Sequence, residues 1–410
     1  MVKYELKKIV SSTGGKIALA LMALLVAVGC WMCISEVEWV NERGDSETGL
    51  AAVSKLRAAQ KEWAGVLDEE RLAQIIRENQ RICATPEAQS KDYRQNDIAY
   101  GWKQGIRPVL NMMNYAYSAG FQEYDWYCNE SVTPDRAGEF YGNRTKRMKD
   151  WLLDKTGSAQ YLFNENEKQY LIDQYENLET PFYLDYTEGW KQVCYYAPFV
   201  IMMAALILGY LCAGIFAGEY RWKADSVFFS ARHGRDKAVW AKIQAGLLLV
   251  TLVYWGSVLF YTLVGLGTLG FDGGSCPLQI DMWKSFYHLT MRKAWLLTVV
   301  GGYIGCLFFA LLTMWVSAKT RSTVFASMVP FLLVFLPTFL ENLNSDWVSR
   351  ALGLFPHQLL EIYQALRYFY VYDFGITVKG ALEIIPVLYL LLSAALVPIM
   401  YFRFRKRAAR

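Results

Sequence analysis

The placement of charges constrains this 410-residue chain more than any other feature. Six apolar stretches contain no Asp, Glu, Lys or Arg. Each is near or above the roughly 18–20 residues that a helix needs to cross a bilayer. The sequence therefore predicts an all-α polytopic membrane protein with six transmembrane helices. The six stretches are residues 17–34, 195–217, 243–268, 294–316, 322–340 and 384–402.

Lys and Arg flank these stretches in an alternating pattern. They gather before the first span, between the second and third, between the fourth and fifth, and after the sixth. Because cytoplasmic loops of membrane proteins are enriched in Lys and Arg, both termini are expected in the cytoplasm, with the protein in the cell membrane. The first span is expected to be an uncleaved anchor rather than a signal peptide, since its apolar run is long.

This topology divides the chain into three parts. Residues 1–34 form a cytoplasmic amphipathic segment and the first span, and residues 195–410 carry the other five spans. Residues 35–194 form a large, mostly helical extracellular insertion. Helices are expected from apolar periodicity and from Thr-Pro starts. They are expected at residues 49–82, 145–155 and 164–176, and after Thr85 and Thr133. A second outer segment, 341–380, is amphipathic, and its stretch 352–372 is expected to lie along the outer membrane interface or to dip into it as a short helix.

Cysteines and histidines indicate no metal site. Four of the eight cysteines lie within spans, while Cys83, Cys128, Cys194 and Cys276 would lie outside, where disulfides persist. A Cys83–Cys128 pair is expected, with four free thiols as the alternative. No Cys or His spacing is typical of a metal-binding motif.

Small residues recur every four positions in two spans. Gly214 with Gly218, and Gly301 with Gly305, each form a GxxxG pair. Such pairs allow close helix approach within one subunit or across a dimer.

The loop at residues 218–242 carries the main functional prediction. It begins acidic, ends basic and has an apolar centre, which is typical of a short amphipathic helix that docks into a groove of a partner. A plain loop that fixes topology is the alternative. The residues expected to couple to a partner are Glu219, Tyr220, Arg221, Val227, Phe228, Phe229, Arg232, Arg235 and Lys237.

The order of these parts resembles the ABC-2 type permeases, the membrane-spanning subunits of many bacterial ABC exporters. The resemblance rests on the N-terminal segment 1–16 and on the loop after the second span, which begins with Glu219 and ends in Lys237 and Lys242. The Gly-Thr that commonly follows that Glu is absent here.

The resemblance implies a permease that exports a peptide, lipid or amphipathic compound. It implies two ATP-binding subunits and a second permease, identical or related, as partners in the lipid bilayer. No nucleic-acid partner is expected. The chain itself is not expected to be an enzyme or to hold a cofactor, because it lacks the GxxxxGK[ST] phosphate loop, so ATP and Mg²⁺ would bind the partner ATPase.

Other functions are less well supported by the sequence. Ion-coupled carriers need ionisable residues inside the membrane, and the six stretches have none. An intramembrane hydrolase needs a nucleophile with a base, or paired acids, and no stretch carries His or an acid. A ligand sensor, an antimicrobial-peptide immunity component or an ion-independent channel remain as alternatives. The many Trp and Tyr residues in 35–194 fit either ordinary packing or a binding surface for an amphipathic ligand.

Overall fold

The computed structural model describes residues 1–231, 233–234, 236–341 and 345–407. Six helices in these residues are long and apolar enough to cross a membrane, as the sequence predicts, which indicates a multi-pass membrane protein. Most extend several residues beyond their apolar run at one or both ends. They are α2 (Thr13–Ser35), α11 (Glu188–Arg221), α13 (Lys237–Leu269), α14 (Met291–Thr320), α15 (Thr323–Glu341) and α18 (Ala381–Arg407).

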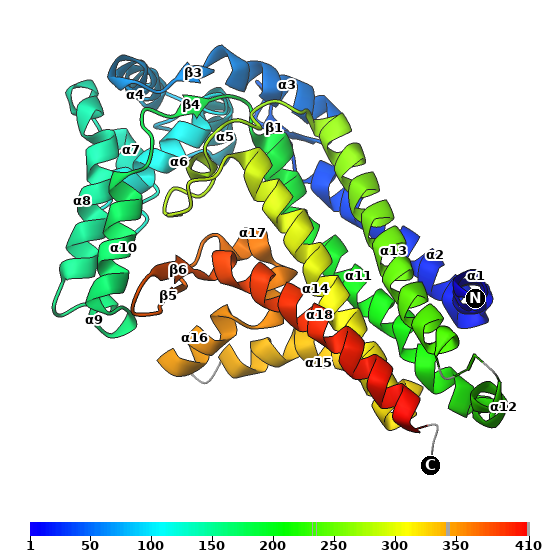
Figure 1. Ribbon diagram of the computed structural model, residues 1–410. Helices are drawn as coiled ribbons and strands as arrows, with labels where there is room; N and C mark the ends of the chain where they lie inside the picture. Colours follow the sequence, from blue (N-terminus) through cyan, green and yellow to red (C-terminus); the bar gives the residue numbers. More distant parts are fainter. Residues whose placement is uncertain (232, 235, 342–344, 408–410) are drawn as a thin grey trace.

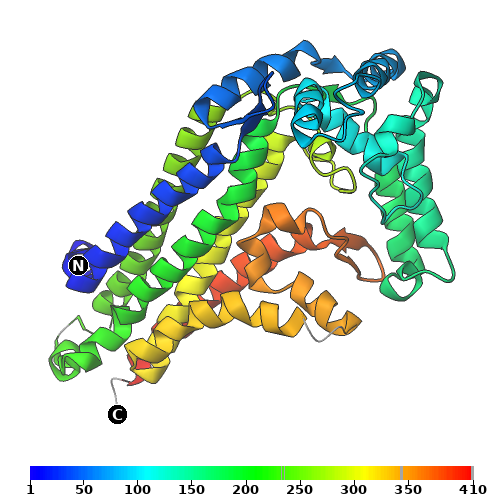
Figure 2. The same ribbon diagram turned by 180° about the vertical axis from the view of Figure 1, so that it is seen from behind.

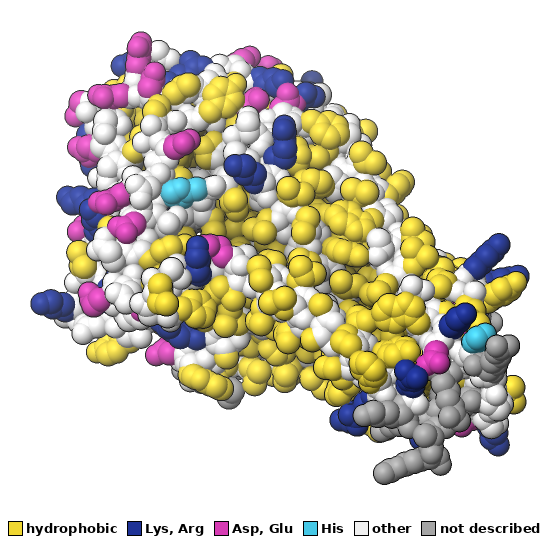
Figure 3. Space-filling view, viewed as in Figure 1, with side chains coloured by type: hydrophobic (Ala, Val, Ile, Leu, Met, Phe, Trp, Pro, Cys, Tyr) yellow, Lys and Arg dark blue, Asp and Glu magenta, His cyan; other side chains and the backbone are white. Residues whose placement is uncertain are grey.

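Helices α11 and α14 form the centre of the bundle (Figure 1). Helix α11 packs against α2, α13, α14 and α15, while α18 packs mainly against α14. The four peripheral helices expose apolar side chains to their surroundings. Figure 3 shows the resulting belt of hydrophobic side chains between two ends that carry most of the charge. This distribution is the one expected of a protein embedded in a bilayer.

Glycines allow close contacts within the bundle. A Cβ at Gly209 of α11 would collide with the ring of Pro330 on α15. Gly301 and Gly305 on α14 do not form a contact between two spans. Cβ atoms at these two positions would instead meet Ile362 and Leu360. A short connecting segment, rather than a neighbouring transmembrane helix, therefore packs against these glycines.

Residues 36–187 form a helical insert between α2 and α11. The expected helix 49–82 is split into α3 and α4, because Gly65 adopts a positive φ and joins a short strand pair. Thr85 begins only a turn, whereas Thr133 begins a 3-10 helix. Helix α11 begins at residue 188, ahead of the apolar stretch that starts at residue 195. The helices are α3 (Leu50–Glu62), α4 (Glu69–Cys83), α5 (Tyr93–Trp102), α6 (Arg107–Ala116), α7 (Cys128–Ser131), η1 (Pro134–Glu139), α8 (Phe140–Leu153), α9 (Ala159–Leu162) and α10 (Glu165–Glu176).

The short strands that the structure describes form separate pairs, of which β3 with β4 joins two segments far apart in the sequence. All three pairs are antiparallel and two-stranded. They are β1 (Glu38–Val40) with β2 (Ser46–Thr48), β3 (Gly65–Val66) with β4 (Tyr183–Leu184), and β5 (Val371–Asp373) with β6 (Val378–Gly380).

The segment between α15 and α18 folds back into the protein. It contains α16 (Asp346–Gly353), η3 (Pro356–Leu359) and α17 (Ile362–Ala365). Leu359, Leu360 and Tyr363 are fully buried, and η3 and α17 pack on α14. The stretch 352–372 thus contains short helices that pack against the bundle, and its depth relative to the membrane interface stays a prediction.

Two arginine side chains, the buried Arg144 and the partly exposed Arg350, join the insert to the rest of the protein. Arg144 of α8 donates hydrogen bonds to the carbonyl oxygens of Trp283 (3.0 Å) and Ser285 (2.8 Å), in the connection between α13 and α14 that also holds η2 (Leu278–Ile280). Burial lowers the pKa of the Arg144 guanidinium. Arg350 of α16 forms a bidentate ion pair with the buried Glu167 of α10. The insert, the α13–α14 connection and α16 are thus held together.

Candidate functional site

A cluster of four charged residues lies where α1 (Val2–Ser11), α11 and α13 meet. At its centre is Lys242, whose side chain is fully buried. The Lys242 ammonium donates to Glu219 Oε1 at 2.7 Å, to Glu5 Oε2 at 3.0 Å and to the carbonyl oxygen of Ile215 at 3.0 Å. These three acceptors match the three donor hydrogens of the ammonium group.

Glu219 is shared by two cations. Its Oε1 accepts from Lys8 of α1 at 2.6 Å as well as from Lys242, and its side chain is only 8% exposed. Two carboxylates and two ammonium groups balance in charge. The cluster therefore fixes α1 to the ends of α11 and α13 without leaving a buried charge unpaired.

The sequence analysis identified only part of this cluster. Glu219 was predicted as the acidic start of a partner-docking loop, and Lys242 as the basic end of that loop. Glu5 was not singled out at all. The available signal was the position of Lys242, which directly follows the apolar Val239, Trp240 and Ala241 and so falls within the first turns of a membrane helix. A lysine at such a position needs acceptors from other elements.

The predicted loop helix is present as α12 (Asp225–Ser230), only six residues long. Val227 on this helix is 72% exposed. Phe228 faces inward, with its ring centroid 5.2 Å from the Lys242 ammonium and 6.3 Å from the ring of Phe404 on α18. Helix α12 thus contacts the charged cluster and α18 with one face and presents an apolar side chain with the other.

The other predicted coupling residues lie around this end of the bundle but do not form one surface. Tyr220 packs its ring near Phe404 and under Arg321. Arg221 and Lys237 are exposed, at the end of α11 and the start of α13. Arg232, Arg235 and the side chain of Phe229 lie outside the described residues.

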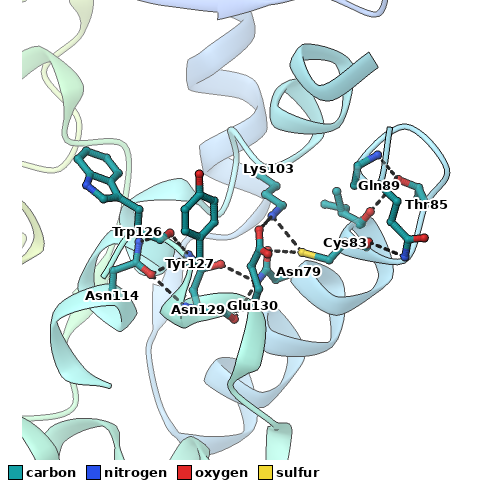
Figure 4. A network of polar contacts seen from close by, with 12 residues as sticks. Asn79, Cys83, Thr85, Gln89, Lys103, Asn114, Trp126, Tyr127, Asn129 and Glu130 are labelled. Carbon is teal, nitrogen blue, oxygen red and sulfur yellow. Dashed lines mark hydrogen bonds and ion pairs between the residues drawn. The ribbon is translucent and has the colours of Figure 1, made fainter. Parts of the chain in front are cut away.

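The predicted Cys83–Cys128 disulfide is not formed, because all eight cysteines are free thiols. Cys83 Sγ lies 3.1 Å from the Lys103 ammonium and 3.7 Å from Asn79 Oδ1 (Figure 4). Cys128 is buried in the insert, and burial raises the pKa of its thiol. Among the described residues, no group of three or more His, Cys, Asp or Glu side chains could hold a metal ion.

A pocket of mixed polar and aromatic lining lies beside this network, between the insert and Asp281 of the α13–α14 connection. Its volume is about 860 Å³. Asn114 and Asn129 are hydrogen-bonded to each other at its wall, and the Arg107 guanidinium stacks 3.7 Å above the ring of Tyr100. Burial lowers the pKa of Arg107. The pocket also has Tyr115, Tyr124, Trp126 and Tyr127 in its lining.

Comparison with protein-family models, with curated proteins and with solved structures finds no match to this chain. No family is therefore assigned. The functional interpretation rests on the sequence pattern and on the geometry described above.

Proposed function

We propose that this chain is the permease subunit of an ATP-driven exporter, and that a separate ATPase subunit docks on α12. The observation that carries the proposal is the double contact of this helix. Val227 is exposed, while Phe228 contacts both the Lys242 cluster and α18. An apolar side chain on a short exposed helix is suited to insertion into a groove of a partner.

The same contacts supply a route for mechanical coupling. Movement of α12 would displace Phe228 against Lys242, which is bonded to residues of α1 and α11. Four elements would then move together. In this proposal the end that carries α1 and α12 is cytoplasmic, the insert is extracellular, and two permeases pair above two ATPase subunits.

The transported compound is proposed to be apolar or amphipathic, such as a lipid or a hydrophobic peptide. The central parts of the six helices carry no charged side chain, so a strongly charged compound would find no counter-charge along them.

A second candidate is a ligand sensor or an antimicrobial-peptide immunity component. The 860 Å³ pocket favours it, because its size lies in the range of small-molecule sites and its lining combines tyrosine rings with Arg107 and paired amides. Such a function would place ligand recognition in the insert and would need no ATPase.

The test is copurification from native membranes in a mild detergent, followed by mass spectrometry. We expect a stoichiometric partner that contains a phosphate-binding loop. Val227→Asp should reduce its recovery by about tenfold, since an unpaired charge would be buried in the docking groove. Ile376→Asp, at a turn residue that is 95% exposed in the outer segment, is the matched control and should retain the partner.

Two results would contradict the proposal, the first for the exporter as a whole and the second for docking on α12. The first is the absence of any ATPase across several mild detergents, which would favour the sensor. The second is equal recovery of the ATPase with wild type and Val227→Asp, which would show that α12 is not the docking element.

A further inference from the structure

A groove runs along α11 at the end that carries α1. Gly214 and Gly218 form its floor, and Cβ atoms added at these positions would meet no atom within 4 Å. This GxxxG pair therefore does not pack against another helix that the structure describes. The space beside it is a pocket of about 290 Å³, bounded by α1, α2, α11 and α15. Figure 2 shows α11 between α2 and α15 on this side of the molecule.

The length of the groove matches one leaflet of a bilayer. Its lining on α11 extends from Tyr210 to Arg221, which is about 16 Å at the helical rise per residue. Half of the hydrocarbon core of a bilayer is about 15 Å. At the end of the groove away from Arg221, Tyr210 packs against Gly14 of α2. Leu211 and Val324 provide apolar walls of the groove. Between Leu211 and Gly218 the groove is therefore lined on α11 by apolar and small residues, against which an acyl chain can lie.

The end of the groove beside Arg221 is basic. Its lining contains three charged residues, Glu5, Lys8 and Arg221. Glu5 is paired with Lys242, and Lys8 with Glu219. Arg221 is exposed and forms no ion pair with any residue that the structure describes. One uncompensated positive charge thus remains where the groove ends.

Aromatic and hydroxyl side chains surround this charge. Trp222 is 64% exposed and lies under the Lys8 ammonium, with 5.4 Å between Nζ and the ring centroid. Ser12 and Thr323 also line the pocket. Trp side chains favour the headgroup level of a bilayer, so this end of the groove is placed at the boundary between hydrocarbon and water.

We propose that the groove binds a phospholipid with an anionic headgroup. One acyl chain lies over Gly214 and Gly218, and the phosphate lies against the Arg221 guanidinium. Arginine pairs well with phosphate because its N–H groups form two parallel hydrogen bonds. The site requires only that the helices lie in a membrane, so it does not depend on the exporter proposal.

The test uses the purified chain in nanodiscs that contain equal amounts of phosphatidylglycerol and phosphatidylcholine. Lipids retained after release into the gas phase are counted by native mass spectrometry. We expect wild type to retain one phosphatidylglycerol in preference to phosphatidylcholine. Added inorganic phosphate should not displace it, because a free phosphate lacks the acyl chain.

Two variants examine the two halves of the site. Arg221→Gln should reduce the preference for phosphatidylglycerol by about fivefold, the effect of one basic residue near an anionic surface. Gly214→Leu should abolish retention of either lipid, because its side chain fills the open groove. Arg403→Gln, at an exposed residue of α18, and Gly256→Leu, at an open glycine of α13, are the controls and should behave like wild type.

Three results would overturn the proposal. One is equal retention of the two lipids by wild type, and another is displacement of the lipid by inorganic phosphate. The third is a change from dimer to monomer in Gly214→Leu with lipid retention unaltered, which would show that a second copy of the chain covers the groove.

Discussion

The buried lysine gives the sharpest prediction for stability. Lys242→Met replaces the ammonium group with an apolar side chain of similar length and leaves Glu5 and Glu219 without their central cation. Breaking a buried ion pair by removing one partner costs about 3–5 kcal/mol. Because Glu219 keeps its bond to Lys8, we expect the lower end, a loss of about 3 kcal/mol in the free energy of unfolding.

A double-mutant cycle isolates the interaction. Glu219→Gln alone should cost about 2 kcal/mol, since Lys242 keeps Glu5 and the carbonyl of Ile215. The double variant should cost about 3 kcal/mol rather than the sum, because each single change already removes the pair.

The assay is SDS-induced unfolding in mixed micelles, followed by circular dichroism. Lys237→Met is the matched control, at an exposed lysine at the start of the same helix, and it should change the free energy of unfolding by less than about 0.5 kcal/mol. Additive losses of stability in the cycle, or equal losses for Lys242→Met and Lys237→Met, would refute the conclusion that this cluster fixes α1 to α11 and α13.

The remaining predictions concern the insert and the segment between α15 and α18. Arg350→Met leaves the buried Glu167 carboxylate without its bidentate partner and should destabilise α16 by about 3 kcal/mol, seen as faster hydrogen exchange there. Arg94→Met, which breaks an exposed pair, should have an effect below about 1 kcal/mol, and equal exchange in both variants would contradict the role of Glu167. Burial lowers the pKa of His357 to about 4, so the unfolded chain binds the proton first as the pH falls. Stability should therefore fall by about 2 kcal/mol between pH 7 and pH 5, relative to His357→Gln, and an identical pH dependence of the two proteins would exclude this cause.

The membrane helices were predictable because a bilayer imposes one strict local condition. A run of about 20 residues without charge is visible in the sequence, and the six helices follow from it. Their ends were less accurate: α11 begins at residue 188, since Glu188 and Lys191 continue the helix as its first turns. Local signals were also sufficient for α8 and α10.

The contacts that assemble the candidate site could not be predicted in the same way. Glu5, Glu219 and Lys242 come from three helices separated by more than 20 residues along the chain, and no local pattern relates them. Of the two GxxxG pairs, only Gly301 with Gly305 is closely packed, and its partner is a connecting segment rather than a transmembrane helix. Gly301 meets Ile362, whereas Gly214 meets open space. Pairing of the cysteines likewise depends on distances that spacing in the sequence does not determine.

The length of α11 and the contacts at its two ends have a mechanical consequence. Its 34 residues span about 50 Å, some 20 Å more than the hydrocarbon core of a bilayer. Near one end, Trp190 donates a hydrogen bond to the carbonyl oxygen of Phe271, and near the other, Glu219 binds the two lysines. The helix therefore forms one continuous connection between the two sides of the bilayer. A ligand whose binding tilts the helix from one side would alter the binding of any ligand on the opposite side that favours one tilt, and by thermodynamic reciprocity the effect is equal in the two directions.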